Sequence, residues 1–197
     1  MKLYWAPQTR SVRTVWMLEE TGLEYDVEPI TLGDEANANN TEFMDASPMG
    51  KVPALVDGDL RMSDSAAICL YLADRYRMGD LAPALDDPLR GKYLYWLTYT
   101  PAVIEPAMAE KMSGAEPNPR SYGWGSFDSM LETMVSGIGE GPWILGEQFT
   151  AADVMLGSSV HFLMLFNMIP EEGPLAVYVE RCRARPAFQA AQSRETT

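Results

Sequence analysis

A proline stands at the entrance of a short apolar run, Val52-Pro53-Ala54-Leu55-Val56. Proline has no N–H to give to a sheet ladder, so within sheets it is confined to strand starts and edges. The run therefore predicts a strand that begins at Pro53. Asp57-Gly58-Asp59 follows and is a strong hairpin signal, with residues 60–62 as the returning strand. An antiparallel hairpin at this point constrains the fold of everything around it.

The residues before the hairpin alternate between strand and helix patterns. We predict strands over residues 1–5 and 25–30, and a helix over 10–21 that has Val12, Val15 and Trp16 on one face and ends at Gly22. Residues 33–46 predict a loop with a short helix, and residues 65–76 a helix. The order βαβαββα predicts a parallel strand pair followed by the antiparallel hairpin, in an α/β domain over residues 1–76.

The second half of the chain shows helical patterns only. Residues 77–88 contain Gly79, Pro83 and Pro88 and predict a linker. After it, residues 89–112 form a long helical pattern that Pro101 and Pro106 interrupt. Further helices are predicted over 126–138, 150–167 and 175–184, with a short last one from 186. The sequence thus predicts an all-helical bundle domain over residues 89–197.

Composition excludes several classes of function. A net charge of −13 disfavours binding to nucleic acid or to an anionic membrane. No apolar stretch reaches the length of a membrane span, and the first residues do not form a signal peptide, so we expect a soluble, cytoplasmic protein. Cys69 and Cys182 lack the spacing of a metal or redox motif, and there is one histidine, so we expect no metal.

The hairpin and the helix after it suggest a ligand site. If the Val52–Pro53 bond is cis, the N–H and C=O of Val52 face outward and can pair with a peptide-like ligand. Ser65, at a helix N-terminus, can bind a ligand carboxylate, and Asp64 a ligand ammonium, with Lys51 nearby. A short ligand with both groups at one end fits, as in the γ-glutamyl end of glutathione. The alternative is an ordinary edge strand followed by an ordinary N-cap.

Chemistry on glutathione requires its thiol to ionise, because the thiolate is the nucleophile. A hydroxyl beside a helix N-terminus stabilises such an anion. Ser11 is our first candidate and Thr9 the second, while Arg10 can act by charge. The alternative is that these residues only cap the helix. Arg10 and Lys51 are local cations near an anionic ligand, whereas for Arg13 we predict a solvated surface charge.

Nearly the whole chain resembles the cytosolic glutathione transferases of the bacterial type. The resemblance rests on Met1-Lys2-Leu3-Tyr4-Trp5, Lys51-Val52-Pro53-Ala54-Leu55, Asp64-Ser65-Ala66-Ala67-Ile68 and Phe149-Thr150-Ala151-Ala152-Asp153. It implies a thioredoxin-like N-terminal domain, a helical C-terminal domain, a homodimer and a role in detoxification. The cysteine of the bacterial beta class is Arg10 here, and the serine of tau-like members is Ala6, so the class stays open.

The electrophile that such an enzyme needs should be small and hydrophobic. Methionines and aromatic residues in the helical half are candidates for the wall of the pocket that binds this electrophile: Tyr99, Val103, Met108, Met112 and Trp124. The alternative for each is an ordinary place in the core. Three functions remain open: a glutathione transferase, a glutathione-dependent lyase, isomerase or thiol reductase on the same scaffold, and a non-catalytic binding or regulatory protein.

Two further features concern structure. Thr150 and Asp153 have the spacing of a capping box and predict the start of a helix. Leu70, Leu94 and Met130 are apolar residues expected on outer helical faces, where they would support the homodimer, and the alternative for each is a place in the core.

Overall fold

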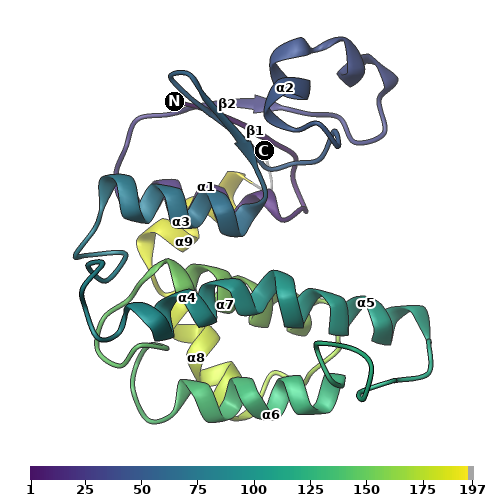
Figure 1. The fold of residues 1–197 in the computed structure, drawn as a ribbon, viewed down its shortest axis with the longest axis vertical. Helices are drawn as coiled ribbons and strands as arrows, with labels where there is room; N and C mark the ends of the chain where they lie inside the picture. Colours follow the sequence, from purple (N-terminus) through teal and green to yellow (C-terminus); the bar gives the residue numbers. More distant parts are fainter. Residues whose placement is uncertain (195–197) are drawn as a thin grey trace. The chain divides into compact units, whose positions relative to one another are not determined.

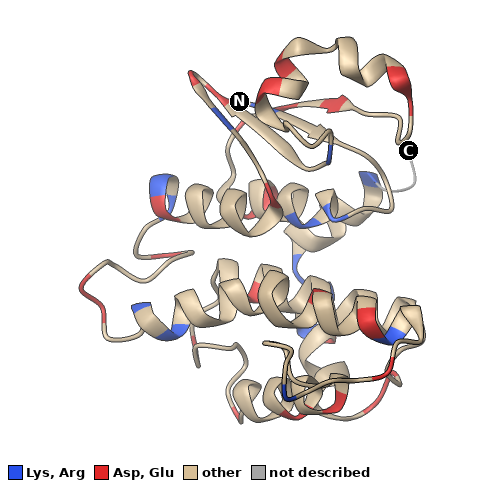
Figure 2. Ribbon diagram, turned by 45° about the vertical axis from the view of Figure 1, so that its right-hand side comes forward, with Lys and Arg blue, Asp and Glu red and all other residues tan. Residues whose placement is uncertain are grey.

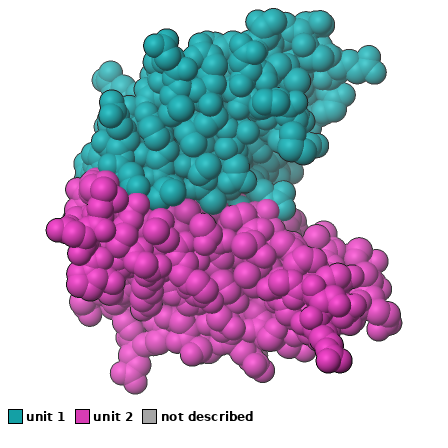
Figure 3. Space-filling model, viewed as in Figure 1, with its two compact units in different colours: residues 1–77, 185–197 teal, residues 78–184 magenta. Residues whose placement is uncertain are grey.

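The structure is a computed structural model, and it describes residues 1–194. It divides into two compact units, which Figure 3 shows in two colours. Unit 1 comprises Met1–Arg77 and the chain from Arg185 onward, and unit 2 comprises Met78–Ala184. Each unit is described by itself below.

A four-stranded mixed sheet forms the middle of unit 1. Its strands are β1 (Lys2–Trp5), β2 (Asp26–Pro29), β3 (Ala54–Asp57) and β4 (Leu60–Ser63), in the order β2-β1-β3-β4. The pair β1/β2 is parallel, and the pairs β1/β3 and β3/β4 are antiparallel. The predicted parallel pair with a following hairpin is confirmed, and with it the thioredoxin-like fold class.

Helices cover both faces of this sheet (Figure 1). On one side lie α1 (Ser11–Thr21) and α3 (Ser65–Tyr76), which contact each other. On the other side lies α2 (Thr41–Ala46), preceded by the 3₁₀ helix η1 (Glu35–Asn39), and it contacts β3 and β4.

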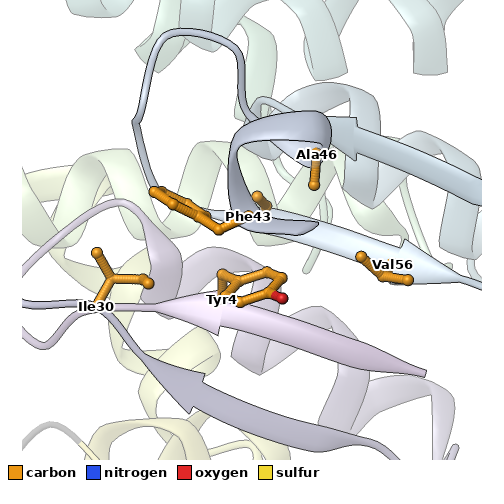
Figure 4. Packing of buried hydrophobic residues seen from close by; sticks show 6 residues of the cluster. Tyr4, Ile30, Phe43, Ala46 and Val56 are labelled. Carbon is orange, nitrogen blue, oxygen red and sulfur yellow. The ribbon is translucent and has the colours of Figure 1, made fainter. Parts of the chain in front are cut away.

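Strand alternation explains how the sheet serves two cores. Tyr4, Ala54 and Val56 point to the α2 side, where they pack with Ile30, Phe43 and Ala46 (Figure 4). Leu3 and Leu55 pair across β1 and β3 on the opposite face and are fully buried.

The last helix, α9 (Pro186–Arg194), belongs to unit 1 and contacts α1. The rings of Trp16 and Phe188 meet edge to face, with centroids 4.9 Å apart. Arg185 Nε donates to Glu20 Oε1 at 2.5 Å, and this carboxylate is nearly buried. The sequence predicts a helical domain over residues 89–197, and in the structure the contacts of α9 group it with unit 1.

Unit 2 is all-helical, as predicted. Its helices are α4 (Arg90–Tyr99), α5 (Glu105–Ser113), α6 (Phe127–Ile138), α7 (Ala151–Leu165) and α8 (Gly173–Arg183). Between α4 and α5 the chain stays helical through a π-helical segment, η2 (Thr100–Ile104). Pro101 and Pro106 therefore mark a change of helix type, since a π turn accommodates the missing N–H.

Gly137 shows how closely α6 approaches α4. A Cβ at this position would lie 1.9 Å from Cζ2 of Trp96, so only glycine fits there. Met130, on the same helix, is 1 % exposed. The prediction that it lies on an outer face was wrong for Met130, because α6 turns this residue into the core of the unit. Leu94, by contrast, is 37 % exposed.

The segment predicted as a linker is attached to unit 2 from Met78 onward. Ala151 N–H donates to the carbonyl of Leu81 at 2.9 Å, and Gln148 Nε2 donates to the carbonyl of Gly79 at 3.2 Å. Leu81 and Ala82 are buried. The segment is thus packed against the start of α7.

Charged side chains of both signs are distributed over both units, with acidic residues in the majority (Figure 2). Within residues 1–194 no helix is both long enough and apolar enough to cross a membrane.

Candidate functional site

The strand register brings three candidate segments to one end of the sheet. Ala54 pairs with Tyr4 on one side and with Ser63 on the other. The residues just before Ala54, just after β1 and just after β4 therefore lie at the same end of the strands. This places Val52-Pro53, the 6–10 loop that enters α1, and Asp64-Ser65 near one another, and α1 and α3 both begin there.

The loop before β3 is held in place by one buried hydroxyl. Ser47 Oγ accepts from Lys51 N–H at 2.9 Å and donates to the Lys51 carbonyl at 2.7 Å. The Val52–Pro53 bond is cis. Among the described residues, the N–H and the C=O of Val52 have no hydrogen-bond partner. Two adjacent backbone groups are thus available to a ligand, and Lys51 is exposed beside them.

Asp64 is the N-cap of α3, and it caps the helix with one of its two carboxylate oxygens. Its Oδ1 accepts from Ala66 N–H at 2.9 Å and from Ala67 N–H at 3.2 Å. Its Oδ2 accepts no hydrogen bond from the described residues. Asp64 is exposed and has a φ of 78°, a region that non-glycine residues rarely adopt. Such local strain clusters at functional sites.

Ser65 lies one residue further and is buried, in contact with a cation. Arg13 Nη1 lies 3.5 Å from Ser65 Oγ, at the limit of a hydrogen bond, and Arg13 is 2 % exposed. The prediction of a solvated Arg13 was wrong. Its helix is buried from Ser11 through Leu18, because α1 packs against both α3 and α9. The sequence carried no signal for the second contact, since α9 is far away along the chain.

Cys69 lies one turn further along α3 and is fully buried, as predicted. Burial raises the pKa of its thiol to about 12, and the charge of Arg13 lowers that pKa only in part. A thiol of this kind stays protonated and unreactive at neutral pH.

Two hydroxyl groups meet at the start of α1. Thr9 Oγ1 lies 2.7 Å from the carbonyl of Ala6 and 2.9 Å from Ser11 Oγ, and it accepts from the N–H of Ser11 at 3.1 Å. Ser11 is fully buried, whereas Thr9 is partly exposed and Arg10 is exposed. Thr9 and Ser11 thus form one pair, and Thr9 is its accessible member.

Tyr4 points away from this end of the strands. Its hydroxyl donates to Glu42 Oε2 on α2 at 2.6 Å, and Lys2 Nζ lies 2.5 Å from the same oxygen. Burial first, and then the hydrogen bond to Glu42, raises the pKa of Tyr4 to about 12. This tyrosine therefore ties α2 to β1, and its hydroxyl is not disposed to activate a thiol at the helix starts.

The five predicted wall residues of the helical unit have different environments. Tyr99 is buried, and its hydroxyl lies 3.5 Å from the carbonyl of Met130. Val103 and Met108 are half-buried, and Met112 is 67 % exposed. Trp124 lines a groove of this unit.

No metal centre is formed by the residues from 1 to 194, where no group of three or more His, Cys, Asp or Glu is placed to hold an ion.

Comparison with known families agrees with this arrangement. The profile described as "Glutathione S-transferase, N-terminal domain" matches residues 1–74, and "Glutathione S-transferase, C-terminal domain" matches residues 82–187. The chain belongs to the glutathione S-transferase family. The two matched regions leave residues 75–81 between them.

Curated relatives are similar to this chain over most of its length and most of their own. Glutathione S-transferase GstA of Escherichia coli O157:H7 is 25% identical over 99% of this chain and 98% of its own. Glutathione S-transferase Z2 of Arabidopsis thaliana is 29% identical over 86% of this chain and 80% of its own. The predicted enzyme family is thereby confirmed, and its class stays open.

Solved structures of the family superpose closely. BphK, a bacterial GST solved as a ternary complex, has a TM-score of 0.82 and 26% identity, with both chains covered in full. A glutathione transferase family member from Pseudomonas fluorescens Pf-5, with two glutathione bound, has a TM-score of 0.77 and 25% identity, over 96% of this chain and 91% of that one.

Proposed function

We propose that this family member binds glutathione at the edge of unit 1 where β3, α1 and α3 begin. The observation that carries the proposal is the unpaired backbone of Val52 beside the N-terminus of α3. The peptide part of glutathione pairs with Val52, next to Pro53, as an added strand does. The γ-glutamyl carboxylate binds at Ser65, and its ammonium binds Asp64 Oδ2. Lys51 offsets part of the ligand's negative charge.

The thiol then lies at the start of α1, where Thr9 and Ser11 meet. We assign the direct hydrogen bond to Thr9, because Ser11 is fully buried and its hydroxyl lies against that of Thr9. The N–H groups of the first turn and the charge of Arg10 also favour the thiolate.

The thiolate attacks a small hydrophobic electrophile. In the conjugation of an aryl chloride, a carbon–sulfur bond forms, the carbon–chlorine bond breaks and chloride leaves with the electron pair. In the helical unit, the predicted candidates for contact with the electrophile are Val103, Met108 and Met112, beside the buried Tyr99. Detoxification of such compounds in the cytoplasm is the corresponding role.

Lyase or isomerase chemistry on the same scaffold remains a second candidate. A thiol reductase is disfavoured, because Arg10 stands where a cysteine would be needed and Cys69 is buried and protonated. A non-catalytic binding protein is the third.

Two measurements on the full chain test the proposal. Calorimetry with glutathione tests binding, and turnover of 1-chloro-2,4-dinitrobenzene, followed by absorbance, tests transfer. Binding with turnover supports a transferase, and binding without any turnover of this or other electrophiles supports the non-catalytic candidate. Absence of glutathione binding would contradict the site.

The proposal includes a homodimer, in line with the family. Sedimentation at micromolar concentration should give about twice the chain mass of 21.9 kDa. A single monomeric species across that range would contradict the dimer and leave the glutathione site untouched.

A further inference from the structure

Unit 2 contains a groove along α5, and Trp124 is the predicted wall residue that lines it. We call it the α5 groove. It has a volume of about 510 Å³ and is lined by Pro106, Ala109, Glu110, Ser113, Ala115, Tyr122 and Trp124. The last three residues come from the segment that leaves α5 and returns to the start of α6 (Figure 1). All of the lining lies within one unit.

Two aromatic rings form one wall of the groove. Tyr122 and Trp124 are stacked, with their centroids 4.6 Å apart and their planes 24° from parallel. Tyr122 is 38 % exposed, and Trp124 is partly exposed. A stacked pair on a loop presents a flat π surface, which suits a planar aromatic ligand.

A nearly buried carboxylate lies in the same lining. Glu110 is 8 % exposed, and its Oε2 accepts from the indole Nε1–H of Trp124 at 3.2 Å. Among the described residues, Oε1 accepts no hydrogen bond and no cation lies within ion-pair distance of Glu110. The neighbouring Lys111 is occupied elsewhere, with its ammonium 4.1 Å from the centroid of the Phe127 ring.

Glu110 Oε1 is open to the groove, because it has no hydrogen-bond partner among the described residues and is not one of their fully buried atoms. A carboxylate gains more from a charged donor than from a neutral one, and Glu110 has one neutral donor for two oxygens. A positively charged donor in the groove would supply the missing hydrogen bond and the missing charge.

We propose that the α5 groove binds a planar aromatic cation, an amidine or protonated amine. The charged group pairs with Glu110 Oε1, and the aromatic ring lies against Trp124. Indole faces attract cations, and a charge-assisted hydrogen bond is about twice as strong as a neutral one. The volume suits one or two rings. The net charge of −13 also draws cations toward the protein. Binding in this groove does not require bound glutathione, because all of the lining lies within unit 2.

Three ligands of one shape and different charge test it. Benzamidine is a cation, benzamide is neutral and benzoate is an anion. Calorimetry on the full-length chain without glutathione should detect benzamidine binding that weakens with salt, and affinity for benzamide at least roughly tenfold lower, because one charge-assisted hydrogen bond is replaced by a weaker one. Benzoate should not bind.

Glu110→Gln removes the charge and keeps an oxygen that can accept from Trp124. We expect benzamidine affinity to fall roughly tenfold or more, to the level of benzamide. The matched control is Glu140→Gln, which makes the same change of net charge at an exposed position of unit 2 and should leave the affinity unchanged.

A measurement on the unmodified chain does not depend on the variant folding. The protein has five tryptophans, and the indole N–H signal that disappears in Trp124→Phe is that of Trp124. Benzamidine should shift this signal more than the other four. Equal affinity for benzamidine and benzamide, a Glu110→Gln variant that binds benzamidine normally, or an unmoved Trp124 signal would each overturn the proposal.

Discussion

Two helices of this protein have an aspartate at the N-cap or in the first turn, and the two carboxylates are used in opposite ways. Asp153 is the third residue of α7 in unit 2 and is fully buried. It accepts from the N–H of Thr150 at 2.9 Å and from Thr150 Oγ1 at 3.2 Å, as the predicted capping pair requires. It also accepts from Ile144 N–H and from the hydroxyl of Tyr178, each at 2.8 Å. Asp64 in unit 1 is exposed and serves two N–H groups of its own helix through one oxygen.

The difference teaches how to distinguish a structural cap from a ligand site. Donors from three separate segments converge on Asp153, so its hydrogen-bonding capacity is used within the protein. Asp64 keeps one oxygen available, has strained backbone and lies beside the unpaired Val52. Similar sequence patterns therefore have different roles, and the donors around each carboxylate decide between them.

The largest effect expected is on stability at Asp153. Asp153→Ala leaves four donors in the interior without their acceptor, so the free energy of unfolding should fall by about 3–5 kcal/mol. Urea denaturation followed by circular dichroism measures it. Asp64→Ala, the matched control in unit 1, should cost about 1 kcal/mol, the usual value of an N-cap. Similar losses in the two variants would break the comparison.

The pH dependence of stability sharpens the same point. Burial raises the pKa of Asp153 to about 6, against the lowering effect of its hydrogen bonds. The folded state then holds this proton more tightly than the unfolded state. The contribution of Asp153 to stability is therefore greatest below pH 4, falls between about pH 4 and 6, and is constant above.

Asp153→Asn does not titrate and isolates this effect. The stability of the unmodified protein relative to the variant should fall between pH 4 and 6 by up to about 3 kcal/mol. Urea denaturation at several pH values measures it. A difference that is constant or rises with pH would contradict the raised pKa.

Ser65→Ala tests the ligand role of the unit 1 helix start. Removal of a hydrogen bond to a charged carboxylate should weaken glutathione binding by about 1.5–3 kcal/mol, with the fold intact. Calorimetry gives the affinity, and Ser136→Ala, at an exposed position of α6, is the control. Unchanged affinity would remove Ser65 from the site.

Thr9→Val tests the accessible hydroxyl of the pair. Loss of a hydrogen bond worth about 1 kcal/mol should raise the pKa of the bound glutathione thiol by a little under one pH unit. The thiolate absorbance of the complex, titrated against pH, measures it. A larger rise in Ser11→Ala than in Thr9→Val would assign the direct contact to Ser11.

The smallest effect expected on stability is that of Asp64→Gly. Glycine adopts a φ of 78° without strain and is tolerated as an N-cap, so the free energy of unfolding should change by a few tenths of a kcal/mol. Glutathione affinity should nevertheless fall, because Oδ2 is lost. Calorimetry and urea denaturation on the same sample separate the two. A variant that keeps full affinity would show Asp64 to be a cap only.

Local signals predicted most of unit 1. Pro53, the Asp57-Gly58-Asp59 turn and the helix over 65–76 act within a few residues of one another, and the structure follows them. The sequence did not predict the burial of Arg13 and Met130, which depends on contacts with segments far away along the chain. Arg13 is buried by helices that start more than fifty residues away, and Met130 faces inward because of the rotation of α6. Helical periodicity reports that a face is apolar, and it does not report what covers that face.

The placement of α9 has a consequence for how the chain is made. Unit 1 is discontinuous, with the whole of unit 2 inserted between α3 and α9. Phe188, which meets Trp16, is synthesised more than 170 residues after it. The ribosome therefore produces the sheet and its first helices long before the residues that complete their core. During synthesis the indole of Trp16 stays without this neighbour until the first turn of α9 has emerged.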